Sequence, residues 1–132
     1  MAQCAVLVVD DEVPYCAVVR EILASYHLDV LVAYQGTQAL SLLESVKPNL
    51  ILLDMMMPGI DGLTLLRQMR QQPALANTPV VMVSANTMNN DRERSLAAGA
   101  NAFLAKPFSA KELRAVLRTF VEVPDTSELE KG

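Results

Sequence analysis

Short apolar runs alternate along the chain with segments in which apolar residues recur at helical spacing. Each run carries mostly aliphatic or β-branched side chains and is apolar at successive positions rather than at every second one. Strands of this kind are buried on both faces, which is typical of a parallel sheet covered by helices on each side. The five runs are 5–9, 30–33, 50–53, 80–83 and 102–105.

The segments between and after the runs predict five amphipathic helices. Pro14 suits the first turn of the first helix, and Thr37 is the expected cap of the second. Gly99 is the expected stop of the fourth helix, and Ser109 begins a capping box in the fifth. The expected helical ranges are about 14–26, 37–46, 61–69, 89–98 and 109–120.

Strands that alternate with helices define an α/β chain, and right-handed crossovers between them produce a doubly wound sheet with helices on both faces. We expect a five-stranded parallel sheet in the flavodoxin-like order 2-1-3-4-5. In this order the first and third strands are neighbours, and ligands bind at the switch point between their carboxyl ends. Residues 1–123 form one expected domain, and the polar residues 124–132 form a tail or the beginning of a linker.

Composition narrows the class of protein. The 132 residues suit a single domain, and a hydrophobic content of 52% argues against disorder. The formal net charge of -4, without a basic stripe, argues against nonspecific binding to nucleic acid or to an anionic membrane. The chain has two cysteines without metal-binding spacing, and it shows neither a signal-peptide pattern nor an apolar run long enough to span a membrane. These features predict a cytoplasmic protein with reduced thiols.

Acidic side chains follow two strands that the expected order makes neighbours. Asp10, Asp11 and Glu12 come directly after the first run, and Asp54 follows the third. Carboxylates held close together repel one another, and their pKa values rise unless a cation joins them. Oxygen ligands without histidine or cysteine favour a hard divalent ion, most simply Mg²⁺.

The fourth and fifth strands add a hydroxyl, Ser84, and an ammonium, Lys106, to the same edge of the sheet. Carboxylates, a metal, a hydroxyl and a lysine together suit a phosphoryl group, because the metal and Lys106 would neutralise the charge on its oxygens. One of the carboxylates can then act as the nucleophile and form an aspartyl phosphate.

Four motifs at these strand ends resemble the receiver domain of two-component response regulators: VVDDE at 8–12, LLDMMMPGIDG at 52–62, VSA at 83–85 and KPF at 106–108. The resemblance covers about residues 4–121. It implies a phosphorylation switch rather than an enzyme, one that takes part only in its own phosphorylation and slow autodephosphorylation. The implied partners are a histidine kinase or histidine phosphotransfer protein and a downstream protein or output domain, with no direct binding of nucleic acid or membrane. It also allows a homodimer through the face of the fourth helix, fifth strand and fifth helix.

The resemblance assigns roles to single residues. Asp54 is the expected phosphoacceptor, Lys106 is expected to contact a phosphoryl oxygen, and Ser84 is expected to move towards the phosphoryl group. Phe103 occupies the position of the switch aromatic, where the family often has tyrosine, so no phenol can bond outward when the ring moves. A cis peptide is expected before Pro107.

The expected metal is Mg²⁺, and the resemblance implies its ligands. These are Asp10, Asp11, Asp54 and the backbone carbonyl of Met56, with Asp11 a more direct ligand than Asp10. Met56 and Asn86 occupy the two positions that tune dephosphorylation in the family. They form an uncharged pair from which no lifetime of the phosphorylated state follows.

Plainer interpretations exist for the same residues. Asp10 or Asp11 could cap the first helix, Asp61 could cap the third, and Lys106 could be a solvated surface lysine. Two further functions stay open: an interaction module of the same fold that works without phosphate, and a phosphatase or phosphotransferase with an aspartyl intermediate. The latter needs a second acid two residues after the nucleophile, where this chain has Met56.

Overall fold

The computed structural model describes residues 5–85 and 90–123 of the chain. Its centre is a parallel sheet made of β1 (Ala5–Val9), β2 (Asp29–Ala33), β3 (Leu50–Asp54), β4 (Val80–Ser84) and β5 (Ala102–Ala105). The strands lie in the order β2-β1-β3-β4-β5, which confirms the predicted fold class and strand order. The switch point between β1 and β3 is therefore present as predicted.

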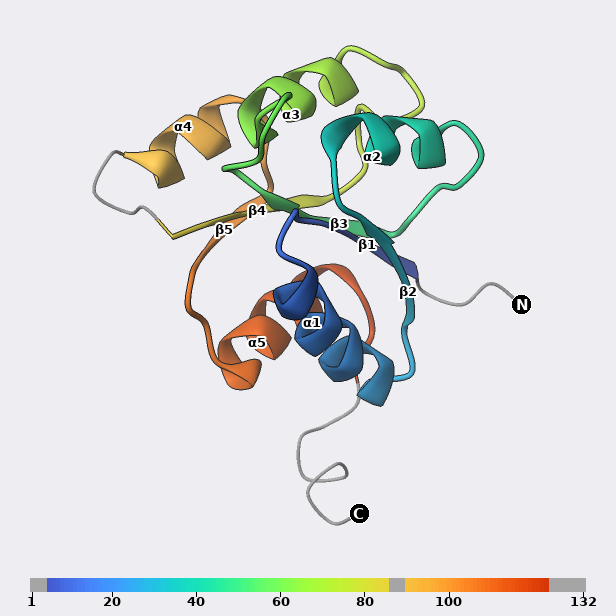
Figure 1. Cartoon of the computed structure of the whole chain (residues 1–132), viewed down its shortest axis with the longest axis vertical. Helices are drawn as coiled ribbons and strands as arrows, with labels where there is room; N and C mark the ends of the chain where they lie inside the picture. The colour runs from blue at the N-terminus through green and yellow to red at the C-terminus, as the bar shows by residue number, and fades with distance from the viewer. Residues whose placement is uncertain (1–4, 86–89, 124–132) are drawn as a thin grey trace.

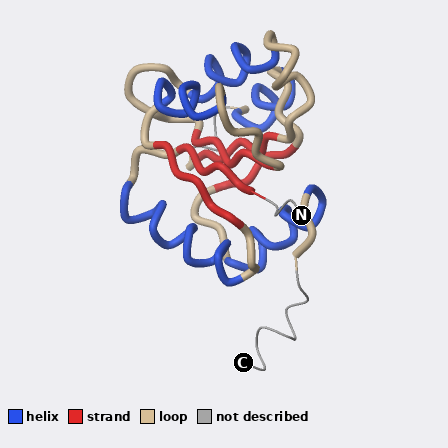
Figure 2. The backbone as a smooth tube through the Cα atoms, turned by 90° about the vertical axis from the view of Figure 1, so that its right-hand side faces the viewer, coloured by secondary structure: helices blue, strands red, loops and turns tan. Residues whose placement is uncertain are grey.

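Helices cover both faces of this sheet. They are α1 (Val13–Ser25), α2 (Gly36–Leu43), α3 (Gly62–Arg70), α4 (Asp91–Ala97) and α5 (Ala110–Phe120). Figure 1 shows α1 and α5 on one side of the sheet and α2, α3 and α4 on the other, and Figure 2 shows the same layers from the side. No helix within residues 5–85 and 90–123 has the length and apolar character needed to cross a bilayer.

The side chains of the strands pack in two separate apolar layers, one on each face of the sheet. In β3, Ile51 and Leu53 pack in the layer that contains α2 and α3, whereas Leu50 and Leu52 pack in the layer that contains α1 and α5. All four side chains are almost completely buried. Burial on both faces explains why these runs are apolar at successive positions, and close packing holds the end of β3 in one place.

Most helix boundaries follow the signals in the sequence. Ser109 and Glu112 form the predicted capping box at the beginning of α5. Pro14 lies in the first turn of α1, where its missing N–H is not needed. Gly99 follows the end of α4 with a φ of 111°, a conformation that side chains other than glycine rarely adopt.

The predicted cap of α2 at Thr37 is wrong. The helix begins at Gly36 with Gln35 as its N-cap, and the Gln35 carbonyl accepts the first helical hydrogen bond from Ala39 at 3.0 Å. Gly36 packs tightly against Ile60: a Cβ added at position 36 would lie only 3.2 Å from the Ile60 Cβ. This tertiary contact has no signature in the local sequence. The predicted beginning of the fourth helix, at residue 89, lies outside the described residues.

Arg70, the last residue of α3, joins three segments of the chain. Its guanidinium donates hydrogen bonds to the carbonyls of Gly99 at 3.0 Å and Leu75 at 2.8 Å, and to the side-chain oxygen of Asn101 at 3.0 Å. The same Asn101 oxygen accepts a hydrogen bond from the Val80 N–H at 2.9 Å. Arg70 therefore ties the end of α3 to the segments that lead into β4 and β5.

We expect Arg70→Met to lower the free energy of unfolding by about 2 kcal/mol, because it leaves partly buried carbonyls without a donor. Urea denaturation monitored by circular dichroism measures the change. Arg67→Met, an exposed position on the same helix, is the matched control and should change stability far less. Equal losses in the two variants would contradict the structural role of Arg70.

Candidate functional site

The parallel register brings the carboxyl ends of β1 and β3 together. Val9 pairs with Leu53, so Asp10, which follows β1, and Asp54, which ends β3, lie beside each other at the switch point. The backbone N–H of Asp10 continues the ladder on the other side by donating to the Ala33 carbonyl at 3.0 Å. Strand pairing thus fixes the backbone at both carboxylates before any side chain is considered.

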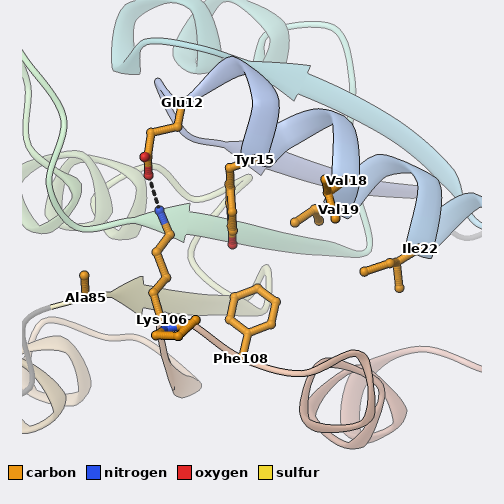
Figure 3. Close-up of a pocket in the computed structure, with 9 residues that line it drawn as sticks. Glu12, Tyr15, Val18, Val19, Ile22, Ala85, Lys106 and Phe108 are labelled. Carbon is orange, nitrogen blue, oxygen red and sulfur yellow. Dashed lines mark hydrogen bonds and ion pairs between the residues drawn. The ribbon is translucent and has the colours of Figure 1, made fainter.

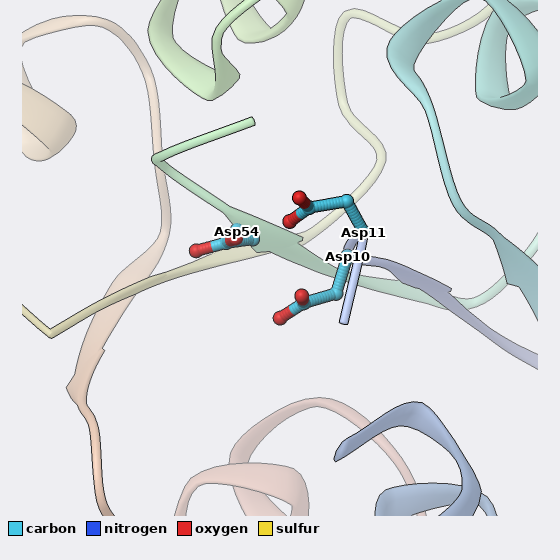
Figure 4. Close-up of side chains that lie close together, drawn as sticks. All are labelled: Asp10, Asp11 and Asp54. Carbon is cyan, nitrogen blue, oxygen red and sulfur yellow. The ribbon is translucent and has the colours of Figure 1, made fainter. Parts of the chain in front are cut away.

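Asp10, Asp11 and Asp54 form one carboxylate cluster (Figure 4). One oxygen from each residue lies within 4.8 Å of the others, as the sequence predicted for Asp10, Asp11 and Asp54. Asp10 and Asp54 are 2% and 5% exposed, whereas Asp11 is open to solvent. Three oxygen ligands at this spacing suit a hard divalent cation, and the open side at Asp11 leaves room for water or phosphate oxygens.

The plainer interpretation of the acids as helix caps holds for one of them. Asp61 is the N-cap of α3, and its side chain accepts a hydrogen bond from the Thr64 N–H at 2.8 Å. The N-cap of α1 is Glu12, which makes no side-chain capping bond, so neither Asp10 nor Asp11 caps that helix. Asp10 accepts a hydrogen bond from the Glu12 N–H at 2.9 Å.

Lys106 places its ammonium group among these carboxylates. Its Nζ lies 2.7 Å from an oxygen of Asp10, 2.9 Å from Glu12 and 3.8 Å from Asp54. The side chain is 12% exposed, so the interpretation of Lys106 as a solvated surface lysine is wrong. The ammonium neutralises part of the negative charge that the strand ends bring together.

Two contacts of Lys106 were not expected from the sequence. Figure 3 shows Lys106 reaching Glu12, with the ring of Tyr15 nearby, and the ammonium lies 4.1 Å from the centre of that ring. Tyr15 in turn meets Phe108 edge to face, with ring centres 6.0 Å apart. Glu12 directly follows the predicted acids in the sequence, so its contact with Lys106 could have been anticipated. Tyr15 belongs to the apolar stripe of α1, and an apolar position does not predict a contact with a cation.

Burial and charge shift the pKa values of both Asp54 and Lys106. The pKa of Asp54 is raised to about 7, first by burial and then by the negative charge of Asp10, while Lys106 and the N–H of Met56 act against the rise. Burial lowers the pKa of Lys106, but its hydrogen bonds to Asp10 and Glu12 outweigh this effect and raise the pKa overall. Lys106 is therefore charged at neutral pH, and a further cation would favour full ionisation of Asp54.

The raised pKa of Asp54 predicts a pH-dependent stability of the metal-free protein. The unfolded chain releases this proton near 3.8, whereas the folded protein holds it up to about pH 7. The contribution of Asp54 to stability is therefore greatest below pH 3.8. It falls by on the order of 2–4 kcal/mol as the pH rises from 3.8 to about 7. Urea denaturation in EDTA at several pH values, on wild type and Asp54→Asn, isolates the effect. A difference between the two proteins that does not change with pH would contradict it.

The Ser84 hydroxyl is held by an acid that the sequence did not point to. Ser84 is completely buried at the end of β4, and its Oγ donates a hydrogen bond to Oδ2 of Asp91 at 2.6 Å. Asp91 lies in the first turn of α4 and is 3% exposed. An acid in a first helical turn is common for reasons of charge alone, so its sequence position gave no sign of this buried contact.

The loop after Asp54 buries two of its three methionines and exposes the third. Met55 and Met57 are buried, whereas Met56 is 67% exposed and its N–H lies 3.4 Å from an Asp54 oxygen. The Gly62 N–H donates to the Met55 carbonyl at 3.0 Å, which brings the beginning of α3 against the end of β3. The backbone of Met56 therefore lies beside Asp54, while its side chain faces solvent.

The remaining predicted positions lie on β5 and just after it. Phe103 is partly buried against the apolar layer that contains α3. The Lys106–Pro107 peptide is cis, as the resemblance implied. The Lys106 N–H donates to the Ser84 carbonyl at 2.8 Å, so the backbone links the lysine to the serine at this edge of the sheet.

A doubly wound sheet with three acids and a lysine at its switch point defines the class of protein. The family model of the response regulator receiver domain matches residues 6–118. The chain belongs to this family, the receiver domains of two-component response regulators.

Curated relatives agree with this assignment. The transcriptional regulatory protein CpxR of Klebsiella pneumoniae is 38% identical over 123 residues, which are 93% of this chain and 51% of that protein. The DNA-binding response regulator MtrA of Mycobacterium tuberculosis is 37% identical over 113 residues, which are 86% of this chain and 48% of that protein. The chain thus spans about half the length of the curated relatives it matches.

Solved structures show the same fold. The receiver domain of the sensor histidine kinase PA1611 from Pseudomonas aeruginosa has a TM-score of 0.83 at 33% identity, covering 90% of this chain and 98% of that one. That structure holds a magnesium ion coordinated in the active site cleft. The chemotaxis protein CheY4 of Vibrio cholerae has a TM-score of 0.85 at 28% identity, and the match covers 91% of this chain and 100% of that chain.

Proposed function

We propose that Asp54 accepts a phosphoryl group from the phosphohistidine of a histidine kinase or histidine phosphotransfer protein. An oxygen of the Asp54 carboxylate forms the new bond to phosphorus, the bond from phosphorus to the imidazole nitrogen breaks, and its electron pair stays on the imidazole. The observation that carries the proposal is the cluster of three carboxylates within 4.8 Å with the Lys106 ammonium beside it.

Asp10, Asp11, Asp54 and the backbone carbonyl of Met56 are the proposed ligands of Mg²⁺. The donor set fits a hard cation, since it contains only oxygen atoms and since burial and repulsion raise the pKa of Asp54. When bound, the ion would offset the charge of the carboxylates and of the transferring oxygens. The magnesium ion in the cleft of the PA1611 receiver domain supports this choice of metal.

The phosphorylated state would be held by Lys106 and Ser84. The new group adds about one and a half to two negative charges beside carboxylates that already repel one another. Lys106 already lies 3.8 Å from Asp54 and would pair with one phosphoryl oxygen. Ser84 would donate a hydrogen bond to another, and Phe103 would turn into the space that this movement leaves.

An apolar groove beside the acceptor suits the protein that carries the donor histidine. The groove has a volume of about 430 Å³, and its lining includes Tyr15, Val18, Ile22, Phe108 and Lys106 (Figure 3). Because Lys106 belongs to both the groove and the carboxylate cluster, a histidine that reaches Asp54 brings its own protein over this groove. Apolar contacts there would orient the donor before transfer.

The signal would leave through the face formed by α4, β5 and α5. This face would contact a downstream protein or output domain, or a second copy of the chain once phosphorylated. We place the receiver domain at residues 1–123 and propose that 124–132 is a tail or a linker. We also place this domain in the cytoplasm, which the two cysteines without metal-binding spacing and the membership of the response regulator family support.

Two alternative functions have less support. Receiver domains are response regulators rather than classical enzymes, and Met56 stands where a phosphatase of this kind would need a second acid. We therefore expect only slow autodephosphorylation. A module that works without phosphate would have no use for Asp10 and Asp54, whose burial as like charges is unfavourable.

Incubation with acetyl phosphate and intact-mass measurement test the proposal. We expect the wild type to gain one phosphoryl group per chain with Mg²⁺ and none with EDTA. No gain under conditions that label another receiver domain would overturn the proposal. Turnover of a phosphomonoester far above one equivalent per chain would favour an enzyme instead. Equal binding of a downstream partner with and without beryllofluoride would favour the phosphate-independent module.

A further inference from the structure

The Ser84 hydroxyl can donate only one hydrogen bond, since it has a single proton. In this structure the proton goes to Oδ2 of Asp91 at 2.6 Å. Both side chains are buried: Ser84 is completely buried, and Asp91 is 3% exposed. A phosphoryl oxygen on Asp54 and the carboxylate of Asp91 are therefore competing acceptors for one buried donor.

The hydrogen bond from Ser84 is also important to Asp91 itself. A buried carboxylate is unfavourable unless it is paired or hydrogen-bonded. Among the described residues, the second partner of Asp91 is Arg94 at 3.3 Å, whose side chain is 55% exposed, so this ion pair is weakened by solvent. Ser84 supplies the buried and shorter of the two contacts.

The pair connects the acceptor region to a short helix. Asp91 begins α4, while Ser84 ends β4. A second buried contact joins the same two regions, because Ser95 of α4 lies 4.0 Å from the sulfur of Met55, the residue after the acceptor. Both contacts therefore join α4 to residues close to Asp54, namely Met55, which follows it, and Ser84, which ends the neighbouring strand.

Building on the proposed function, we propose that Asp91 is a positioning residue that holds the Ser84 hydroxyl while Asp54 is unphosphorylated. Phosphorylation then transfers this hydrogen bond from Asp91 to the phosphoryl oxygen, and Asp91 loses its buried partner. The first turn of α4 is released from β4 as a result. Asp91 thus sets how strongly the unphosphorylated state is favoured, and it links the acceptor to the α4 side of the signalling face.

Removal of the competing acceptor should make the phosphorylated arrangement easier to reach. We expect Asp91→Ala to bind beryllofluoride with Mg²⁺ about tenfold more tightly than the wild type, measured by isothermal titration calorimetry. Asp91→Asn keeps the shape and a neutral acceptor, so its gain should be smaller. Arg94→Ala is the matched control, since it removes only the exposed partner of Asp91, and it should bind as the wild type does.

A double-mutant cycle with Ser84→Ala separates positioning from a general structural effect. In the Ser84→Ala background, Asp91→Ala should leave the affinity unchanged, because the donor for which the two acceptors compete is absent. A gain that persists in this background overturns the inference, as does equal affinity of wild type and folded Asp91→Ala. If the alanine variant does not fold, Asp91→Asn takes its place in the cycle, with the smaller gain expected of it. If the wild type binds beryllofluoride no more tightly than Asp54→Asn does, the proposed function is overturned and this inference with it.

Discussion

Replacement of Asp54 by asparagine is expected to abolish phosphoryl uptake while leaving the protein at least as stable as the wild type near pH 8. The amide has no carboxylate oxygen to attack phosphorus. It also carries no charge, so the repulsion from Asp10 and the cost of burying an ionised Asp54 disappear. Loss of the chemistry together with a gain or no change in stability distinguishes a functional acid from a structural one.

Intact-mass measurement after treatment with acetyl phosphate and Mg²⁺ gives the first readout, and urea denaturation gives the second. Asp61→Asn is the matched control, because Asp61 is an exposed acid in the same loop that only caps α3. It should take up the phosphoryl group as the wild type does. Full labelling of Asp54→Asn, or a clear loss of stability near pH 8, would contradict this role of Asp54.

Gly62→Ala is expected to impair both folding and phosphorylation. A Cβ at this position would lie 2.8 Å from the Cα of Met55 and closer still to the carbonyl oxygen of Asp54. Both are backbone atoms, so the end of β3 or the beginning of α3 must shift. We expect a loss of about 1–3 kcal/mol in the free energy of unfolding. Since the shift moves the acceptor itself, phosphorylation should slow at least about tenfold.

Gly59→Ala is the control for Gly62→Ala, because it lies in the same loop and a Cβ there would meet nothing within 4 Å. Its φ of 82° makes alanine unfavourable by about 1 kcal/mol, but the acceptor should keep its place and its rate. Urea denaturation and the rate of mass gain with acetyl phosphate compare the two variants. A Gly62→Ala protein that is phosphorylated as fast as Gly59→Ala would show that this close approach does not position Asp54.

The fold and the convergence of the acids could be predicted because both depend on regular patterns. The run that ends in Asp54 is short and apolar at successive positions, which is typical of a strand covered on both faces. Once the strand order is known, Asp10, Asp54, Ser84 and Lys106 must lie at one edge of the sheet. No contact between particular side chains was needed for that inference.

The contacts of Ser84 with Asp91 and of Lys106 with Tyr15 could not be predicted, because Asp91 and Tyr15 lie on helices whose rotation and depth the pattern does not give. Asp91 looked like an ordinary acid in the first turn of a helix, and Tyr15 like a core residue of α1. The wrong cap at Thr37 has a similar origin. Local preference favoured threonine, whereas the N-cap is Gln35, two residues earlier, and Gly36 in the first turn packs against Ile60.

The central claim, that Asp54 carries the phosphoryl group, is tested most directly by trapping the acyl phosphate. Borohydride reduces an aspartyl phosphate to homoserine, and peptide mapping by mass spectrometry then locates the modified residue. After treatment with acetyl phosphate and Mg²⁺, we predict homoserine at position 54 and at no other aspartate. Homoserine at Asp10 or Asp11, or a phosphate that survives reduction on a hydroxyl side chain, would contradict the claim.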